Sequence, residues 1–152
     1  MMNDLRDLYQ EIILDHNRNP RNFRKIEGAT VTLEGHNPLC GDRYTIYLLL
    51  DDDIVKDISF TGAGCAISKA SASVMTAMLK GKTRAEAEAL FQQFHEVATG
   101  HAPIGNAQLE SLGKLGVFAG VREFPMRVKC ATLAWHTMHN GLEGKHEGAT
   151  TE

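Results

Sequence analysis

The chain has 152 residues and a formal net charge of −3; 43% of its residues are hydrophobic and 23% are charged. This length fits one globular domain, which buries roughly two thirds of the surface of the unfolded chain. The slightly acidic balance gives no electrostatic basis for binding nucleic acid. No apolar run approaches the roughly 20 residues of a membrane helix. The first residues, Met1 to Asp7, lack the apolar centre of a signal peptide, so we expect a cytoplasmic protein.

The first predicted element is an amphipathic helix that begins at Asp4, after the capping residue Asn3, and ends near His16. Residues 17–22 combine asparagine with proline and predict a loop. The helix is expected to dock onto the domain by one apolar stripe, whose residues recur at helical spacing. The stripe consists of Leu5, Leu8, Tyr9, Ile12 and Ile13.

Three predicted strands follow, over residues 29–34, 44–50 and 54–61. The first alternates apolar and polar residues, as in a half-buried strand, and the other two are rich in β-branched and aromatic residues. The connections between these strands are short, which favours an antiparallel meander.

The third predicted strand follows a charged turn at Asp51–Asp53, and one of its residues does not fit the pattern. Lys56 interrupts the face that we expect to be buried. The other residues expected on that face are Ile54, Ile58 and Phe60.

The second half of the chain predicts helices over residues 65–79, 83–97, 109–121 and 126–142, with a loop over 100–106. The residues expected to be buried are Ile67, Ser71, Val74 and Met78 in the first of these helices, Ala87, Leu90, Phe91, Phe94 and Val97 in the second, and Val128, Ala131, Trp135 and Met138 in the last.

Thr83 and Glu86 have the spacing of a capping box at the start of the second of these helices. The order of one helix, three strands and several helices predicts an α+β domain, in which helices pack on one face of a small antiparallel three-stranded sheet. We expect residues 1–143 to form this single domain and residues 144–152 to form a flexible C-terminal tail.

The stretch from Gly35 to Leu50 contains the most informative local pattern, because Cys40 and Asp42 are separated only by Gly41. A thiolate and a carboxylate this close can bind one metal ion, since glycine lets the backbone turn sharply enough to direct both inward. Taken alone, the three-residue pattern is weak. The alternative is a tight loop around an inert buried cysteine.

The other two cysteines lie near predicted helix starts. Cys65 is expected at a helix N-terminus, where the helix dipole favours a thiolate. Cys130 follows Arg127 by three residues, so the two share a helix face. Each cysteine alone is explained by core packing. However, three cysteines cannot all pair in disulfides, and together with Asp42 they favour a metal site with one reactive sulfur.

The histidines are weaker candidates for metal ligands. His36 lies close to Cys40 in the sequence and is an alternative to Asp42 as the fourth ligand. We rank Asp42 as the better candidate of the two. His136 and His139 are three residues apart on the last predicted helix and could chelate a metal. At about 100° per residue, however, His139 points away from Cys130. We therefore interpret these two histidines as a solvated or interface pair.

Four segments of this chain resemble the SufU-type proteins of the IscU/NifU-like iron–sulfur scaffold superfamily. They are LYQEIILDHNRNPRNF, HNPLCGDR, GAGCAISKASAS and the segment with Arg127, Cys130, Leu133 and Trp135. The resemblance extends from about Leu5 to about Gly141. It implies a metal site that consists of Cys40, Asp42, Cys65 and Cys130.

The resemblance also implies an activity: a zinc-dependent sulfurtransferase that takes persulfide sulfur from a SufS-type cysteine desulfurase, with Suf scaffold proteins as later acceptors. In the family's scheme a histidine of the partner frees the thiolate that corresponds to Cys40, which then attacks the persulfide. Arg127 is expected to steady Asp42 or the transferred persulfide. Zinc suits a tetrahedral site of three thiolates and one carboxylate.

Two departures separate the chain from IscU-type scaffolds. Lys129 stands where those proteins have a histidine, and residues 124–129 replace their Leu-Pro-Pro-Val-Lys segment. An insertion is expected around residues 100–121, as in SufU-type members. Two alternatives remain: a scaffold that holds a [2Fe–2S] cluster on the same ligands, and an interaction module whose zinc is only structural.

Overall fold

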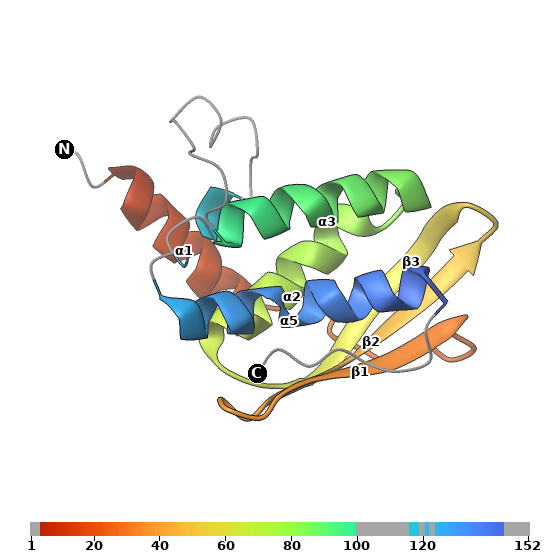
Figure 1. Ribbon diagram of the computed structural model, residues 1–152, viewed down its shortest axis with the longest axis horizontal. Coiled ribbons are helices and arrows are strands. Elements are labelled where there is room, and N and C mark those ends of the chain that lie inside the picture. Colours follow the sequence, from red (N-terminus) through yellow and green to blue (C-terminus); the bar gives the residue numbers. More distant parts are fainter. Residues whose placement is uncertain (1–3, 100–115, 119–120, 122–123, 145–152) are drawn as a thin grey trace.

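The computed structural model describes residues 4–99, 116–118, 121 and 124–144, and the side chains from residue 10 onward (Figure 1). Its elements are α1 (Asp4–Arg18), β1 (Val31–Asn37), β2 (Asp42–Asp51), β3 (Ile54–Ala63), α2 (Ala66–Leu79), α3 (Arg84–Thr99) and α5 (Pro125–Leu142). Most of the predicted insertion and residues 145–152 of the predicted tail lie outside the described residues. None of the described helices combines the length and the apolar composition needed to cross a bilayer.

The three strands form one antiparallel sheet in the order β1-β2-β3, which confirms the predicted meander. Its central register pairs Leu33 with Ile46 and Ile46 with Phe60. The predicted bounds are too short at one end of the hairpin. β1 continues to Asn37 and β2 begins at Asp42, so the sheet supports the chain up to a loop of residues 38–41.

The expected inner face of β3 is wrong in its first half. A register shift between Leu49 and Leu50 places Val55 opposite Leu50 and Asp57 opposite Leu49, which leaves Lys56 unpaired. The extra residue reverses the alternation locally. As a result Val55 is buried, Lys56 is exposed and Ile54 is 45% exposed. Lys56 therefore does not interrupt the core.

The described helices lie on one side of the sheet, as Figure 1 shows. α5 packs against β1 and β2, α2 packs against β3, and α1 and α3 pack on these two helices. The core is centred on Trp135, which is fully buried and stacks on Phe94 with a centroid distance of 4.6 Å. This arrangement confirms the predicted α+β class with helices on one face.

α2 is buried over a wider surface than we expected. Ile67 and Met78 are only partly buried, whereas Ser71 and Val74 are fully buried as predicted. The reason is that α1, α5 and β3 all pack on this helix. Small side chains allow these close approaches, and the buried residues are Ser68, Ala70, Ser71, Ala72, Ser73, Val74, Met75, Thr76 and Leu79.

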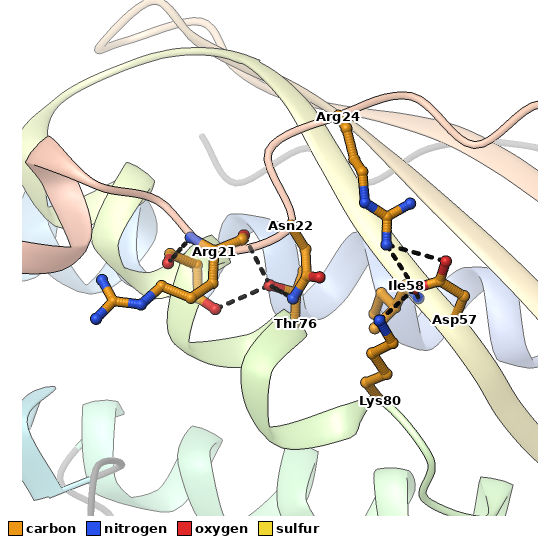
Figure 2. Close-up of polar contacts among 8 residues, drawn as sticks. Arg21, Asn22, Arg24, Asp57, Ile58, Thr76 and Lys80 are labelled. Atoms are coloured by element: carbon orange, nitrogen blue, oxygen red, sulfur yellow. Dashed lines mark hydrogen bonds and ion pairs between the residues drawn. The ribbon is translucent and has the colours of Figure 1, made fainter.

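The connection from α1 to β1 is fastened to α2 by hydrogen bonds, as Figure 2 shows for Thr76. The Thr76 hydroxyl donates to the Arg21 carbonyl at 3.1 Å and accepts from Asn22 Nδ2 at 3.2 Å. The Ser73 hydroxyl oxygen accepts from the Arg21 amide at 2.8 Å and lies 2.7 Å from His16 Nδ1. These buried hydroxyls give the polar residues of the α1–β1 loop a structural role.

The predicted capping box is confirmed at the start of α3. The Glu86 amide donates to Thr83 Oγ1 at 3.1 Å, and the Thr83 amide donates to Glu86 Oε1 at 2.9 Å. These contacts lower the pKa of Glu86. Each side chain satisfies a backbone donor that the first turn would otherwise leave free.

Gly35 allows α5 to lie close to β1. A Cβ atom at this position would overlap with Thr137 Oγ1 and would lie 3.2 Å from Leu133 Cδ1. Gly141 permits a second close contact farther along α5, against Leu48 and Val31. The two glycines therefore determine how closely α5 packs on the sheet.

We expect Gly35→Ala to destabilise the fold by about 1–3 kcal/mol, because an inserted methyl group overpacks this contact. Chemical denaturation measures the change. The double variant Gly35→Ala/Thr137→Ala should recover part of the loss, since Thr137 Oγ1 is the nearest clashing atom. Equal stability of Gly35→Ala and the unchanged protein would show that the helix can move away at no cost.

Candidate metal centre

Three parts of the chain meet at one end of the sheet, where Cys40, Asp42 and Cys130 form one group and Cys65 lies beside Asp42. Cys40 lies in the loop 38–41, Asp42 begins β2, Cys65 caps α2, and Cys130 lies in the second turn of α5. Cys40 Sγ and Cys130 Sγ are 3.5 Å apart, and Cys65 Sγ is 4.0 Å from Asp42 Oδ2. The ligand atoms of Cys40, Asp42 and Cys130 all lie within 4.8 Å of one another.

The loop that carries Cys40 is held at its base and open at its tip. The Gly41 amide donates to the Asn37 carbonyl at 2.8 Å, and the Leu39 amide donates to Asn37 Oδ1 at 3.1 Å. Gly41 has a φ of 77°, which disfavours other residues. Cys40 itself is exposed and Leu39 is 58% exposed. This loop therefore offers its thiol to solvent from a fixed base.

Cys65 is attached to its surroundings at several atoms. Its amide donates to Asp42 Oδ1 at 2.9 Å, and its sulfur accepts from the Ser68 amide at 3.4 Å as the cap of α2. The Ser68 hydroxyl lies 2.9 Å from the Tyr44 hydroxyl. Gly64 has no room for a side chain, since a Cβ atom would lie 2.5–2.7 Å from oxygens of Asp42, Ser68 and Tyr44.

Cys130 is the buried thiol of the group, with 5% of its surface exposed, and Asp42 beside it is fully buried. Burial raises the pKa of Cys130 far above its usual range, and the neighbouring Asp42 carboxylate and Cys40 thiol raise it further. Burial likewise raises the pKa of Tyr44, so its hydroxyl stays protonated. A cation among these groups would favour the thiolates instead.

The donor set fits a metal ion that prefers sulfur. Thiolates are soft ligands that select zinc or iron–sulfur clusters over magnesium and calcium. A carboxylate beside three sulfurs completes four donors, which is the number that zinc takes in protein sites. The charge of such a cation would also offset the burial of Asp42.

Two other residues were considered as part of the site, and both have contacts of their own. His36 contacts Arg43, its partner across the sheet, at 3.4 Å, and it alternates with Asn37 onto the opposite face. The Arg127 guanidinium lies over the Phe124 ring at 4.6 Å. Asp42 rather than His36 therefore faces the sulfurs, and the expected contact of Arg127 with Asp42 stays a prediction.

The sequence interpretation did not identify three residues that surround the ligands. These are Asn37, Tyr44 and Ser68. Each has a signal in hindsight: Asn37 precedes a proline as in an Asx turn, Ser68 is three residues beyond a helix cap, and Tyr44 follows Asp42 on the same strand face.

Comparison with known proteins identifies the family of this chain. Residues 8–131 match the family described as the NifU-like N terminal domain. The chain belongs to this family. Its predicted ligands all lie in the matched segment, which covers more than half of the chain.

Relatives with two different names are similar over almost the whole chain. The zinc-dependent sulfurtransferase SufU of Bacillus subtilis (strain 168) is 39% identical over 145 residues, which are 95% of each chain. The iron–sulfur cluster assembly scaffold protein IscU of Streptococcus pyogenes serotype M1 is 36% identical, over 93% of this chain and 87% of the relative. The crystal structure of FiSufU from Fervidobacterium islandicum AW-1 has a TM-score of 0.76 at 36% identity and covers 90% of this chain and 95% of that one.

The His136/His139 pair, which the sequence predicts to be solvated or at an interface, lies between α3 and α5. His139 stacks on Phe91 at 4.4 Å, with Nδ1 2.7 Å from Glu88 Oε2 and Nε2 3.3 Å from Glu143 Oε1. Each of these contacts is an ion pair only when His139 is protonated. His136 packs against Phe91 at 5.3 Å and against His95 at 5.5 Å. The pair therefore joins two helices.

Burial of His136, together with the charges of His95 and His139, lowers its pKa to about 4. The unfolded chain protonates this residue near pH 6.5. Between these values the unfolded state binds more protons, so stability falls as the pH is lowered from about 6.5 toward 4. We expect His136→Phe, which cannot be protonated, to lose less stability over this range. Denaturant unfolding at several pH values measures the stability of the unchanged protein and of His136→Phe. If the two stabilities fell equally with pH, the lowered pKa of His136 would not be the cause.

Proposed function

We propose that this protein is a zinc-dependent sulfurtransferase of iron–sulfur cluster assembly. In this proposal, Cys40, Asp42, Cys65 and Cys130 bind one zinc ion, and Cys40 accepts sulfur from the persulfide of a SufS-type cysteine desulfurase. When bound, zinc supplies the positive charge that keeps the cysteines deprotonated at neutral pH. The name of the Bacillus subtilis relative supports zinc and sulfur transfer.

The observation that carries the proposal is the difference between the three sulfurs. Cys40 is exposed in a loop, whereas Cys130 is buried in α5. Cys65 is also exposed, but its amide binds Asp42 and its sulfur accepts from the Ser68 amide. Cys40 lies outside the helices, so its sulfur can move toward a partner by giving up its 3.5 Å contact with Cys130 Sγ, with no change to a helix cap. A site that served the fold alone would have no need for one exposed thiol on a separate loop.

The transfer is a thiol–disulfide type of exchange. The Cys40 thiolate attacks the outer sulfur of the donor's persulfide, and a new bond forms between Cys40 Sγ and that sulfur. The sulfur–sulfur bond of the donor breaks, and the donor cysteine leaves as a thiolate that takes up the persulfide proton. One sulfur–sulfur bond replaces another, so the step needs no external oxidant or reductant.

The fixed part of the site supports this exchange. Asp42 is held by the Cys65 amide, and Cys130 is buried in the second turn of α5. These residues stay in place while Cys40 changes its bonding. The open loop around Cys40 gives a partner access to the sulfur.

A scaffold function is the second candidate, because relatives of similar identity carry the name of iron–sulfur cluster scaffold. In that case the same donors would hold a [2Fe–2S] cluster as cargo. Lys129 precedes Cys130 in this chain, and a protonated lysine cannot serve as a ligand. The desulfurase partner, the Suf scaffold acceptors and the cytoplasmic location stay predictions.

Mass spectrometry after incubation with a cysteine desulfurase and cysteine tests the proposal. We expect a sulfur adduct on Cys40 and about one zinc per chain by elemental analysis. Cys40→Ala should keep the fold and part of its zinc but accept no sulfur, because the other three ligands remain. Cys65→Ala and Cys130→Ala should lose zinc and stability first.

Two results would contradict this proposal. A sulfur adduct on Cys65 or Cys130, with Cys40 unmodified, would mean that the roles of the sulfurs are assigned wrongly. Iron and acid-labile sulfide at comparable stoichiometry, with little zinc, would favour the scaffold. The melting temperature of Cys40→Ala serves as the control, because an unfolded variant would also accept no sulfur.

A further inference from the structure

Asn37 is a fully buried polar residue at the end of β1, next to the metal centre. Its side-chain oxygen accepts the Leu39 amide at 3.1 Å, and its carbonyl accepts the Gly41 amide at 2.8 Å. The first of these bonds determines the orientation of the amide group, because an N–H donor must face the oxygen and not the nitrogen. The side-chain amide of Asn37 therefore cannot flip without losing its hydrogen bond to the Leu39 amide.

The side-chain nitrogen of Asn37 has no hydrogen-bond acceptor among the described residues. Asn37 Nδ2 is buried and makes no hydrogen bond there. A buried N–H group without an acceptor costs free energy, and such groups are rare in native proteins. We therefore expect Asn37 Nδ2 to find an acceptor in another state of the site, such as the metal-bound one.

The strand register indicates where Nδ2 lies. Asn37 and Asp42 are partners across the hairpin and both are buried, so their side chains are neighbours on the inner face. Two residues earlier on that face, Gly35 lies against Thr137 and Leu133 of α5.

The same contacts give the direction of α5 over β1. Gly141 lies against Val31, and Gly35 lies against Leu133, so β1 and α5 run in opposite directions. The strand advances by roughly 6.6 Å from Gly35 to Asn37. The turn of α5 that faces Asn37 is therefore the one before Leu133, which carries Cys130.

We propose that Asn37 is a positioning residue of the metal centre, whose side-chain N–H donates a hydrogen bond to the Cys130 sulfur when that sulfur is a metal-bound thiolate. This inference rests on the proposed function only in assuming a metal on these ligands. A thiolate accepts an N–H hydrogen bond more strongly than a thiol does. The bond would keep Cys130 in place while Cys40 reacts.

A pair of variants separates this role from a purely structural one. Asn37→Ser keeps an oxygen that can accept the Leu39 amide, as in an ST turn, but its side chain is too short to bring a donor to Cys130. Asn37→Ala removes the acceptor as well. If Asn37 only shapes the loop, Asn37→Ser should bind zinc like the unchanged protein and Asn37→Ala should not. If it donates to the sulfur, both variants should be impaired.

The first measurement is the zinc dissociation constant, obtained by competition with a chromophoric chelator in the absence of any desulfurase. We expect both variants to bind zinc about 10- to 100-fold more weakly, the usual effect of losing a partner of a ligand. Wild-type affinity in Asn37→Ser would overturn the proposal.

The second measurement is the sulfur-to-cobalt charge-transfer band at saturating Co²⁺, which does not depend on affinity. Loss of an N–H donor leaves the sulfur richer in electrons, so the band should move to lower energy in both variants. An unchanged band in Asn37→Ala would also overturn the proposal, and this variant decides if Asn37→Ser fails to fold. A wild-type protein that binds zinc but accepts no sulfur on Cys40 would refute only the proposed function.

Discussion

The hydrogen bond from the Cys65 amide to the Asp42 carboxylate is the contact on which the site depends. Asp42 is the first residue of β2 and is fully buried, and Cys65 is the cap of α2. Their contact therefore joins the β1–β2 hairpin to the turn between β3 and α2. This contact requires a glycine at position 64, because any side chain there would collide with the Asp42 oxygen. Once these two turns are joined, their two cysteines lie at the same end of the sheet.

The third cysteine reaches this point because of how α5 packs. Small residues at the β1–α5 contact, above all Gly35, let the helix lie directly on the sheet. Trp135 is packed behind it, stacked on Phe94 of α3. The core therefore holds Cys130 firmly, whereas Cys40 is held by the backbone of its loop and by the contact of its sulfur with Cys130 Sγ. The chemical difference between the sulfurs follows from this difference in packing, and the proposed division between one carrier and two anchors relies on it.

Much of this arrangement could be predicted from local patterns. The spacing of apolar residues predicted α1, α2, α3 and α5, and Thr83 with Glu86 predicted the start of α3. The register shift at Lys56 could not be predicted, since a bulge is decided by pairing across the sheet and leaves no pattern in one strand. The sequence did not predict the wide burial of α2, because serine and threonine are polar residue types. Ser73 and Thr76 are nevertheless buried, and their hydroxyl groups form hydrogen bonds with a loop that is distant in the sequence.

The site was predictable in its residue types but not in its surroundings. Cys40, Asp42 and Gly41 form a local signal, whereas Cys65 and Cys130 were grouped with them through the resemblance to SufU-type proteins. Asn37 carries no such signal, because its importance lies in a buried N–H group that only the three-dimensional packing reveals.

The central claim is that these three thiolates and one carboxylate hold a single zinc ion. Zinc K-edge X-ray absorption of the purified protein tests it most directly. The account predicts a first shell of three sulfurs at about 2.3 Å and one oxygen at about 2.0–2.2 Å. A shell with two sulfurs or fewer, an imidazole in place of the carboxylate, or iron in place of zinc would contradict it.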